Sequence, residues 1–507
     1  MVFNSNPMFA GLAAFFFLLL SPYAGRQTQA PQATVPPTVF KTDVENVVLD
    51  VVVTDHDGRP VTGLRKEDFS VYEDGQAQTV QYFNAPEADA AKADLATEGR
   101  AVIVLDALNS KFEDFAYAVG SVKKLLHGTE KTLPQPTALM MLNEHGLRML
   151  HDYTTDSGAI LAAMDKQRHD ISISLRGDAM PFADVVDISL GAMEQLARAN
   201  LGSGRQQSVL WVSAGIQTQS LESLWSSNLN DYVRALRLLS DEMLRSRTTM
   251  NAIDPQGVGM GRVTPQGLLV SPDGEYDSGD LATSLNAYES GASNLTLATL
   301  TQQTGGVYLY NRNDVDAEIG RALADAATAY ALAYSPSNHD YNGKFRKLKI
   351  DVHNPAWTVR CRPGYFALPA TVLVSNSSAY EIRHALTAQV NYAGVGVTVQ
   401  AQPAAADQQP VQIAVDSHTL NWQVQSDGKY QAHIELLAVS FNAKQKALYQ
   451  VRRTMSANLA AAAYPQALEK PWNIALNIPL DKSATRVRVV LRDTGSQRIG
   501  SAQTALP

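Results

Sequence analysis

The middle of the chain alternates short apolar runs with amphipathic segments, and this alternation restricts the possible folds more than any other feature. Apolar runs typical of buried strands cover residues 101–105, 137–142, 209–212, 250–253 and 307–310. Segments with helical apolar spacing cover residues 112–126, 158–164, 184–199, 232–245 and 295–303. Strands that are apolar on both faces and alternate with helices predict an α/β fold, with a doubly wound, mainly parallel sheet covered on both sides.

Two β-rich regions are predicted beside this unit. Short β-branched runs separated by Asp-Gly turns open the chain after a Pro- and Thr-rich stretch, and strand-like runs near the C-terminus have the spacing of a β-sandwich, with the Ala-rich segment 457–468 as a loop or short helix. The predicted organisation is a leader at 1–30, a small β unit at 31–84, a linker at 85–99, the doubly wound domain at 100–368, with a long loop at 255–294 and a closing β segment, and a β-rich domain at 369–507.

The N-terminus predicts export. Residues 9–20 form an unbroken apolar run of 12 residues, followed by a polar stretch rich in small residues. A membrane helix needs about 20 apolar residues, so this length fits the core of a signal peptide. The start of the leader has no Lys or Arg, which leaves an uncleaved anchor as the alternative. We expect an extracytoplasmic protein that contacts the membrane only through its leader, before cleavage.

The charge and the cysteine content argue against two classes of protein, nucleic-acid-binding proteins and disulfide-stabilised modules. The net charge is -8, and no dense run of Lys and Arg occurs, which argues against nucleic-acid binding. The single cysteine, Cys361, rules out an intramolecular disulfide framework. Its position in a strand-like segment favours a half-buried apolar role over a reactive thiol.

Oxygen-bearing residues follow the first predicted strand of the central sheet. Asp106 leaves that strand, and Asn109 and Ser110 come directly after it. Ligands of doubly wound sheets bind at the carboxyl ends of the strands, and carboxylate, amide and hydroxyl oxygens suit a hard cation such as Mg²⁺.

This segment resembles the metal-ion-dependent adhesion site of von Willebrand factor A domains, which have the pattern Asp-x-Ser-x-Ser after the first strand. Asp106 and Ser110 match its first and last positions, whereas Leu108 replaces the middle serine. After the fourth strand such domains have Thr-Asp-Gly, where this chain has Ser213-Ala214-Gly215, and no Thr stands in for the ligand of the remaining loop.

A wider resemblance covers about residues 44 to 368. The segments VVLDVVVTDHDGRPVTGLRKEDFSVYEDG, IVLDALNS, HDYTTD, VLWVSAGI, TGGVYLYN and GKFRKLKIDVHNPAWTVRCRPGYFA occur in order. They are similar to an exported von Willebrand factor A-related family common in acidobacteria. The resemblance implies a von Willebrand factor A-like fold and an extracytoplasmic location, and no defined activity.

Two interpretations of the strand end remain. In the first, Asp106 and Asn109 make turn and cap hydrogen bonds, because Leu108 and Ala214 remove two ligands and one carboxylate alone holds Mg²⁺ poorly. In the second, Asp106 and Ser110 are the remnant of a metal site, with Asn109 and Ser213 as further oxygen ligands or as part of a binding rim. We favour the first interpretation, which requires no cofactor.

Catalytic motifs are lacking in the sequence. It has no H-E-x-x-H helix, no G-x-S-x-G elbow and no phosphate-binding loop of the G-x-x-x-x-G-K-[ST] type. Ser121 and Lys124 match S-x-x-K without its partner motifs, and Asp55-His56-Asp57-Gly58 begins like a calcium loop but lacks the distal Glu, so a solvated helix face and a hairpin turn are expected there.

The sequence therefore predicts an exported, non-catalytic binding protein that uses the rim of its von Willebrand factor A-like domain, with a protein or a glycan at the cell envelope as partner. Three alternatives stay open. They are a secreted hydrolase with an unrecognised site in the C-terminal β region, a fully metal-dependent adhesion domain, and a structural component of the envelope.

Overall fold

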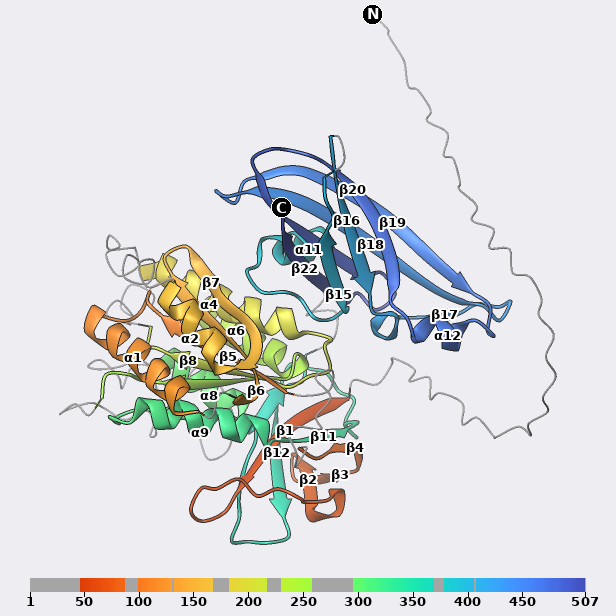
Figure 1. Cartoon of the computed structure of the whole chain (residues 1–507). Coiled ribbons are helices and arrows are strands. Elements are labelled where there is room, and N and C mark those ends of the chain that lie inside the picture. The colour runs from red at the N-terminus through yellow and green to blue at the C-terminus, as the bar shows by residue number, and fades with distance from the viewer. Residues whose placement is uncertain are drawn as a thin grey trace, which may run out of the picture. The chain divides into compact units, whose positions relative to one another are not determined.

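The structure is a computed structural model, shown in Figure 1. It describes residues 46–86, 99–129, 132–166, 182–216, 229–257, 295–368, 378–404 and 407–506. All of these residues belong to one compact unit, Glu45–Pro507. The predicted leader, almost all of the linker 85–99 and most of the loop 255–294 lie outside the described residues.

A six-stranded sheet forms the centre of the α/β part. Its strand order is β10 (Tyr308–Leu309), β9 (Thr248–Ile253), β8 (Gln207–Val212), β5 (Arg100–Asp106), β6 (Thr132–Asn143) and β7 (Gly146–Asp156). All neighbours pair in parallel except β6 and β7, which form an antiparallel hairpin. The sequence analysis missed β7, because this edge strand is mostly half-buried and lacks a continuous apolar run. The mainly parallel sheet confirms the predicted α/β architecture.

Helices cover both faces of this sheet. Along β5, Ile103 and Leu105 join one core with α1 (Phe112–Gly128), α2 (Ser157–Lys166) and α9 (Val315–Ala327). Val102 and Val104 join a second core with α4 (Phe182–Asn200), α6 (Leu229–Arg245) and α8 (Leu295–Thr304). Because successive side chains of a strand point to opposite faces, both faces of β5 are dry, which explains its unbroken apolar sequence.

The N-terminal strands pair with strands that follow the central sheet. One sheet has the order β13 (Thr358–Arg360), β1 (Val47–Thr54), β11 (Tyr330–Tyr334) and β4 (Val80–Asn84). The other has the order β14 (Gly364–Phe366), β12 (Phe345–Val352), β2 (Phe69–Glu73) and β3 (Gln76–Gln78). Leu49 pairs with Leu332 and Val71 with Ile350, so segments far apart in sequence share one core. Local sequence patterns do not reveal such long-range pairing, and the predicted domain boundaries stay predictions.

The C-terminal part begins with α11 (Ser378–Thr387), a helix that the sequence analysis did not predict, and continues as two antiparallel sheets around a shared apolar core. The smaller sheet has the order β15 (Val397–Ala401), β16 (Gln408–Val415) and β20 (Trp472–Pro479). The larger contains β17 (Gln423–Val424), β18 (Tyr430–Asn442), β21 (Ala484–Asp493) and β22 (Ile499–Ala505), with β19 (Ala447–Leu459) paired to β18. In the Ala-rich segment 457–468, the first residues complete β19 and Tyr464–Leu468 forms the short helix α12.

Among the described residues, no helix is both long enough and apolar enough to cross a bilayer.

Candidate functional site

Asp106 and Ser213 leave neighbouring parallel strands at the same edge of the central sheet. Asp106 is the last residue of β5, and Ser213 directly follows β8. The sequence order of the strands reverses between β5 and β8, because β6 lies on the other side of β5. Ligands of doubly wound sheets bind at such a switch point. The residues predicted from the sequence thus lie where this fold class places its sites.

The Asp106 carboxylate accepts four hydrogen bonds from inside the protein. Oδ1 accepts one from the backbone N–H of Asn109 at 2.9 Å. Oδ2 accepts three, from Asn109 Nδ2 at 2.9 Å, from Trp211 Nε1 at 2.9 Å and from Ser213 Oγ at 2.8 Å. We call Asp106 and its three donor residues, Asn109, Trp211 and Ser213, the Asp106 cage. Asp106 itself is 0% exposed, so its side chain meets these donors in place of solvent.

Burial and hydrogen bonding act on Asp106 in opposite directions. Burial raises the pKa of its carboxyl above the ordinary value, while the hydrogen bonds from Asn109, Ser213 and Trp211 work to lower that pKa. A buried carboxylate is costly unless donors replace its hydration, and charge-assisted hydrogen bonds of this kind are among the stronger ones in proteins. The cage is therefore an internal solvation shell for one carboxyl group.

The remaining predicted residues extend the cage. Asn109 Nδ2 also donates to Ser189 Oγ on α4 at 3.0 Å, whereas the buried Oδ1 of Asn109 has no hydrogen-bond partner in the described part of the chain. Ser110 Oγ accepts from the backbone N–H of Ala214 at 3.2 Å, and Ser213 Oγ accepts from Gly215 N–H at 3.0 Å. The bond between Ser110 and Ala214 ties the loop after β5 to the loop after β8, and the bond between Ser213 and Gly215 fixes the shape of the second loop.

Trp211 is the member of the cage that the sequence analysis did not assign to the site. It was predicted to be a core residue of its strand, and it is fully buried there. Its register with Val104 on β5 brings the indole N–H to the Asp106 carboxylate. Nothing in the local sequence shows this register, so the hydrogen bond could not be predicted from the sequence.

Aromatic side chains are exposed beside the cage. Phe112, the first residue of α1, is 60% exposed, and Tyr117, further along the same helix, is 41% exposed. The Tyr117 hydroxyl donates to the carbonyl of Asn313 at 2.5 Å, which holds its ring in place. Ser110 itself is half-buried, and Lys111 between it and the helix is exposed. The accessible surface at this edge therefore carries two exposed rings with charges of both signs, Lys111 and Glu113, and the Asp106 carboxylate lies beneath it.

Other motif residues have structural partners. Ser121 is buried within α1, and Lys124 forms an ion pair with Asp316 of α9 at 2.9 Å. Asp55 Oδ1 accepts from the backbone N–H groups of Asp57 and Arg59 at 2.9 and 2.8 Å, the arrangement of a side-chain-stabilised turn. Cys361 is half-buried, and burial raises the pKa of its thiol to about 11.

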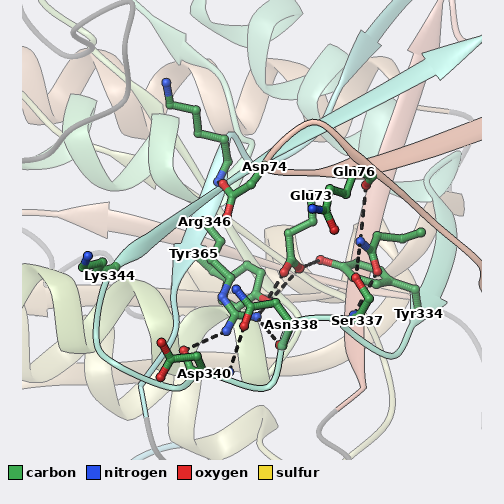
Figure 2. Close-up of polar contacts among 12 residues, drawn as sticks. Glu73, Asp74, Gln76, Tyr334, Ser337, Asn338, Asp340, Lys344, Arg346 and Tyr365 are labelled. Atoms are coloured by element: carbon green, nitrogen blue, oxygen red, sulfur yellow. Dashed lines mark hydrogen bonds and ion pairs between the residues drawn. The ribbon is translucent and has the colours of Figure 1, made fainter.

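A buried charged network outside the predicted site is centred on Glu73 (Figure 2). Glu73 Oε1 accepts from Arg346 at 3.0 Å, while Oε2 accepts from the hydroxyls of Tyr334 and Tyr365 at 2.5 and 2.8 Å. Burial, together with the negative charge of Glu73, raises the pKa of both tyrosines. These residues come from β2, β11, β12 and β14, so the network joins the two distant segments that build the paired sheets.

A cavity of about 380 Å³ lies at the opposite edge of the central sheet from the cage. Its walls include the loop 200–204 and the end of α6, which lead into the amino ends of β8 and β9, and Val47, Tyr341 and Tyr365 from the paired sheets. Asp241 and Arg247 also line it, but they are engaged with Phe366 N–H and Asp50. In this fold class ligands bind at the carboxyl edge, so the cage edge remains the candidate site.

Comparison with known proteins gives structural likenesses only. No protein-family model matches the chain, and no curated protein matches its sequence. Among solved structures, it is similar to a von Willebrand factor type A protein from Catenulispora acidiphila, with 11% identity over 92% of this chain and 74% of that one, and a TM-score of 0.27. It is also similar to the VWA domain of SpRpn10, with 16% identity over 45% of this chain and 94% of that one, and a TM-score of 0.22.

A further likeness is to proximal thread matrix protein 1 from the mussel byssus, with 12% identity, a TM-score of 0.25 and coverage of 46% of this chain and 48% of that one. The chain thus spans about half the length of the mussel protein. Identities and TM-scores this low say nothing about activity, and the α/β architecture of this chain rests on its own sheet order.

Proposed function

We propose that this chain is an exported, non-catalytic binding protein of the von Willebrand factor A-related type. Its rim, residues 106–112 and 213–216, would dock a protein or glycan of the cell envelope without a metal ion. One observation carries the proposal. The only carboxylate of the rim, Asp106, is fully buried, and hydrogen-bond donors of the chain already occupy both of its oxygens.

The donor set argues against Mg²⁺ in the manner of the adhesion domains. Mg²⁺ requires near-octahedral coordination by oxygen, and in proteins it is held by one or two carboxylates with waters. Here Leu108 and Ala214 provide no ligand atom, and the indole N–H of Trp211 points at the carboxylate, where a cation would need to approach. The residues present do not fit Mg²⁺. The hydrogen-bond donors of the cage would stabilise the negative charge of Asp106 in place of the ion.

The same burial argues against catalysis at the rim. A general base must come within hydrogen-bond reach of its substrate. Asp106 has no exposed surface, and both of its oxygens already accept hydrogen bonds from Asn109, Trp211 or Ser213. The cage fixes the shape of the rim and leaves binding to the residues around it.

Phe112 is the residue best placed to contact a partner. It is 60% exposed and follows the rim loop directly, with Lys111 exposed on one side and Tyr117 on the same helix. Exposed aromatic residues are typical anchors of protein interfaces. We assign the docking surface to this end of α1.

A capture experiment with the mature full-length chain tests the proposal. The immobilised protein is exposed to envelope extract with and without chelator, beside Phe112→Ser and the matched control Tyr82→Ser, which removes a ring that is 56% exposed on β4. We expect a partner that is captured in chelator, lost with Phe112→Ser and kept with Tyr82→Ser.

Capture that chelator abolishes would favour a metal-dependent adhesion site, and the absence of any partner would favour a structural role. Screening against ester, peptide and glycoside substrates completes the test, because turnover lost in Asp106→Ala would contradict the non-catalytic assignment.

A further inference from the structure

The C-terminal part exposes a long strand with one unpaired edge. β19 pairs with β18 over most of its 13 residues, and no second strand pairs with it in the described part of the chain. Figure 1 shows β19 beside β18 in the blue region. An unpaired edge presents free backbone N–H and C=O groups that another extended chain can pair with.

The register with β18 fixes which β19 side chains face the core. Ile434, Leu436 and Ala438 of β18 belong to the core between the two C-terminal sheets. Their partners on β19 are Met455, Arg453 and Val451. Because directly paired residues of an antiparallel sheet lie on the same face, these three side chains form one column on the core-facing side of β19. An arginine therefore stands between two apolar residues.

The core is left open along this column. The smaller sheet also ends on this side, since β20 pairs only with β16 among the described strands, and β20 approaches β19. Val451 and Met455 are half-buried against the core, and so is Trp472 at the start of β20. The opposite side of the sandwich differs, because there β15 packs against β22. The seam between β19 and β20 is thus the side where additional apolar groups could still be buried.

Arg453 is an unneutralised charge in this seam. It is exposed, and its guanidinium donates to the carbonyl of Arg452 at 2.9 Å, with no carboxylate within ion-pair distance in the described residues. Arg452, on the other face of the strand, differs, because it forms an ion pair with Glu435 at 3.2 Å. A charge that points inward on an edge strand prevents indiscriminate pairing, but it is also a specific contact for a partner of opposite charge.

We propose that β19 accepts an extended segment of a partner polypeptide as an added strand. The segment has apolar, acidic and apolar residues at alternate positions, so that its carboxylate meets Arg453 while its apolar side chains cover Val451 and Met455. A second copy of this chain fits less well, because antiparallel pairing of two β19 strands about their centres would bring the Arg452–Arg453 pairs together, and like charges on neighbouring strands repel.

Peptide binding to the full chain tests this inference. The probe is a blocked, dye-labelled heptapeptide, Thr-Val-Thr-Glu-Thr-Val-Thr, compared by fluorescence anisotropy with the same peptide carrying Lys in place of Glu. We expect the Glu peptide to bind about tenfold more tightly than the Lys peptide, as for about 1.4 kcal/mol of charge complementarity. In Arg453→Glu this preference should invert.

Arg452→Glu is the matched control, since it changes the net charge equally but lies on the opposite face. It should keep the preference for the Glu peptide. Equal binding of both peptides, no binding of either, or the same inversion in Arg452→Glu would overturn the proposal. So would a concentration-dependent dimer in sedimentation that Arg453→Glu abolishes, because the occupant would then be a second copy.

Discussion

The indole Nε1 of Trp211 donates a 2.9 Å hydrogen bond to Oδ2 of Asp106, and both side chains are fully buried. A bulky core residue of one strand thereby helps to solvate the carboxylate that ends the neighbouring strand. Asn109 and Ser213 complete this shell. The relation explains how donors of the chain itself solvate a fully buried carboxylate at the sheet edge.

Trp211→Phe should lower the free energy of unfolding by about 1–3 kcal/mol, because the buried Oδ2 of Asp106 loses one of its donors. Urea denaturation followed by circular dichroism measures the change. Trp472→Phe is the control, since that indole is half-buried and has no hydrogen-bond partner among the described residues. Equal stabilities of the wild type and Trp211→Phe would show that the hydrogen bond from Trp211 to Asp106 contributes nothing to stability.

The Glu73–Arg346 pair should behave as one unit in stability. Removing one partner leaves the other charge buried beside Tyr334 and Tyr365, so Glu73→Gln or Arg346→Met should each cost about 3–5 kcal/mol. The double variant should cost clearly less than the sum of the two, because it buries no unpaired charge. Guanidinium denaturation of all four proteins gives the coupling energy. Strict additivity would mean that Glu73 and Arg346 are not energetically coupled within the network of Figure 2.

A second charged cluster predicts pH dependence. Arg198 of α4 forms ion pairs with Glu194 at 2.8 Å, with Glu242 of α6 at 3.1 Å and with Glu381 of α11. One arginine thus faces three carboxyl groups. Burial raises the pKa of Glu242 to about 7; Arg198 works to lower that pKa, and the other two glutamates add to the rise.

Because this pKa is higher in the folded state than in the unfolded state, the folded state favours protonated Glu242. The stability that this group contributes is complete below its unfolded pKa near 4.5 and is lost as the pH rises through about 7. Glu242→Gln removes the titration. The melting temperature of Glu242→Gln should match that of the wild type near pH 4.5 and exceed it by a few degrees at pH 8. A difference independent of pH, measured by differential scanning fluorimetry, would contradict this assignment.

Cys361 should react slowly with thiol reagents in the folded protein. Burial raises the pKa of its thiol from 9.0 to about 11, so the thiolate fraction at pH 8 falls by about a hundredfold relative to an ordinary cysteine. Labelling with a chromogenic disulfide reagent at pH 8 should therefore be slow in buffer and fast in denaturant. Rapid labelling of the native protein would show that the thiol is accessible and reactive.

The central sheet could be predicted because its strands and helices have strong local signals. A strand with both faces buried, such as β5, has an unbroken apolar run, and helices such as α4 have a clear apolar stripe. The half-exposed edge strand β7 has neither signal and was missed. The pairing of β1 with β11 was also not predicted, because contacts between segments so distant leave no pattern in either one.

Most of the candidate site could be predicted, because its residues follow strands that the sequence indicates clearly. Asp106, Asn109, Ser110 and Ser213 follow strands, and parallel strands bring their carboxyl ends together, so their proximity follows from the fold class. The participation of Trp211 depends on strand register and side-chain rotamer. Glu73 and Arg346 resemble ordinary exposed charges in their local sequence, and only the fold shows that both are buried.

Isothermal titration of the full chain with Mg²⁺, beside Asp106→Ala, tests most directly whether the rim works without metal. We expect no binding with a sub-millimolar dissociation constant by either protein, because the cage donors hold the carboxylate that the ion would need. Sub-millimolar binding by the wild type that disappears in Asp106→Ala would contradict the account.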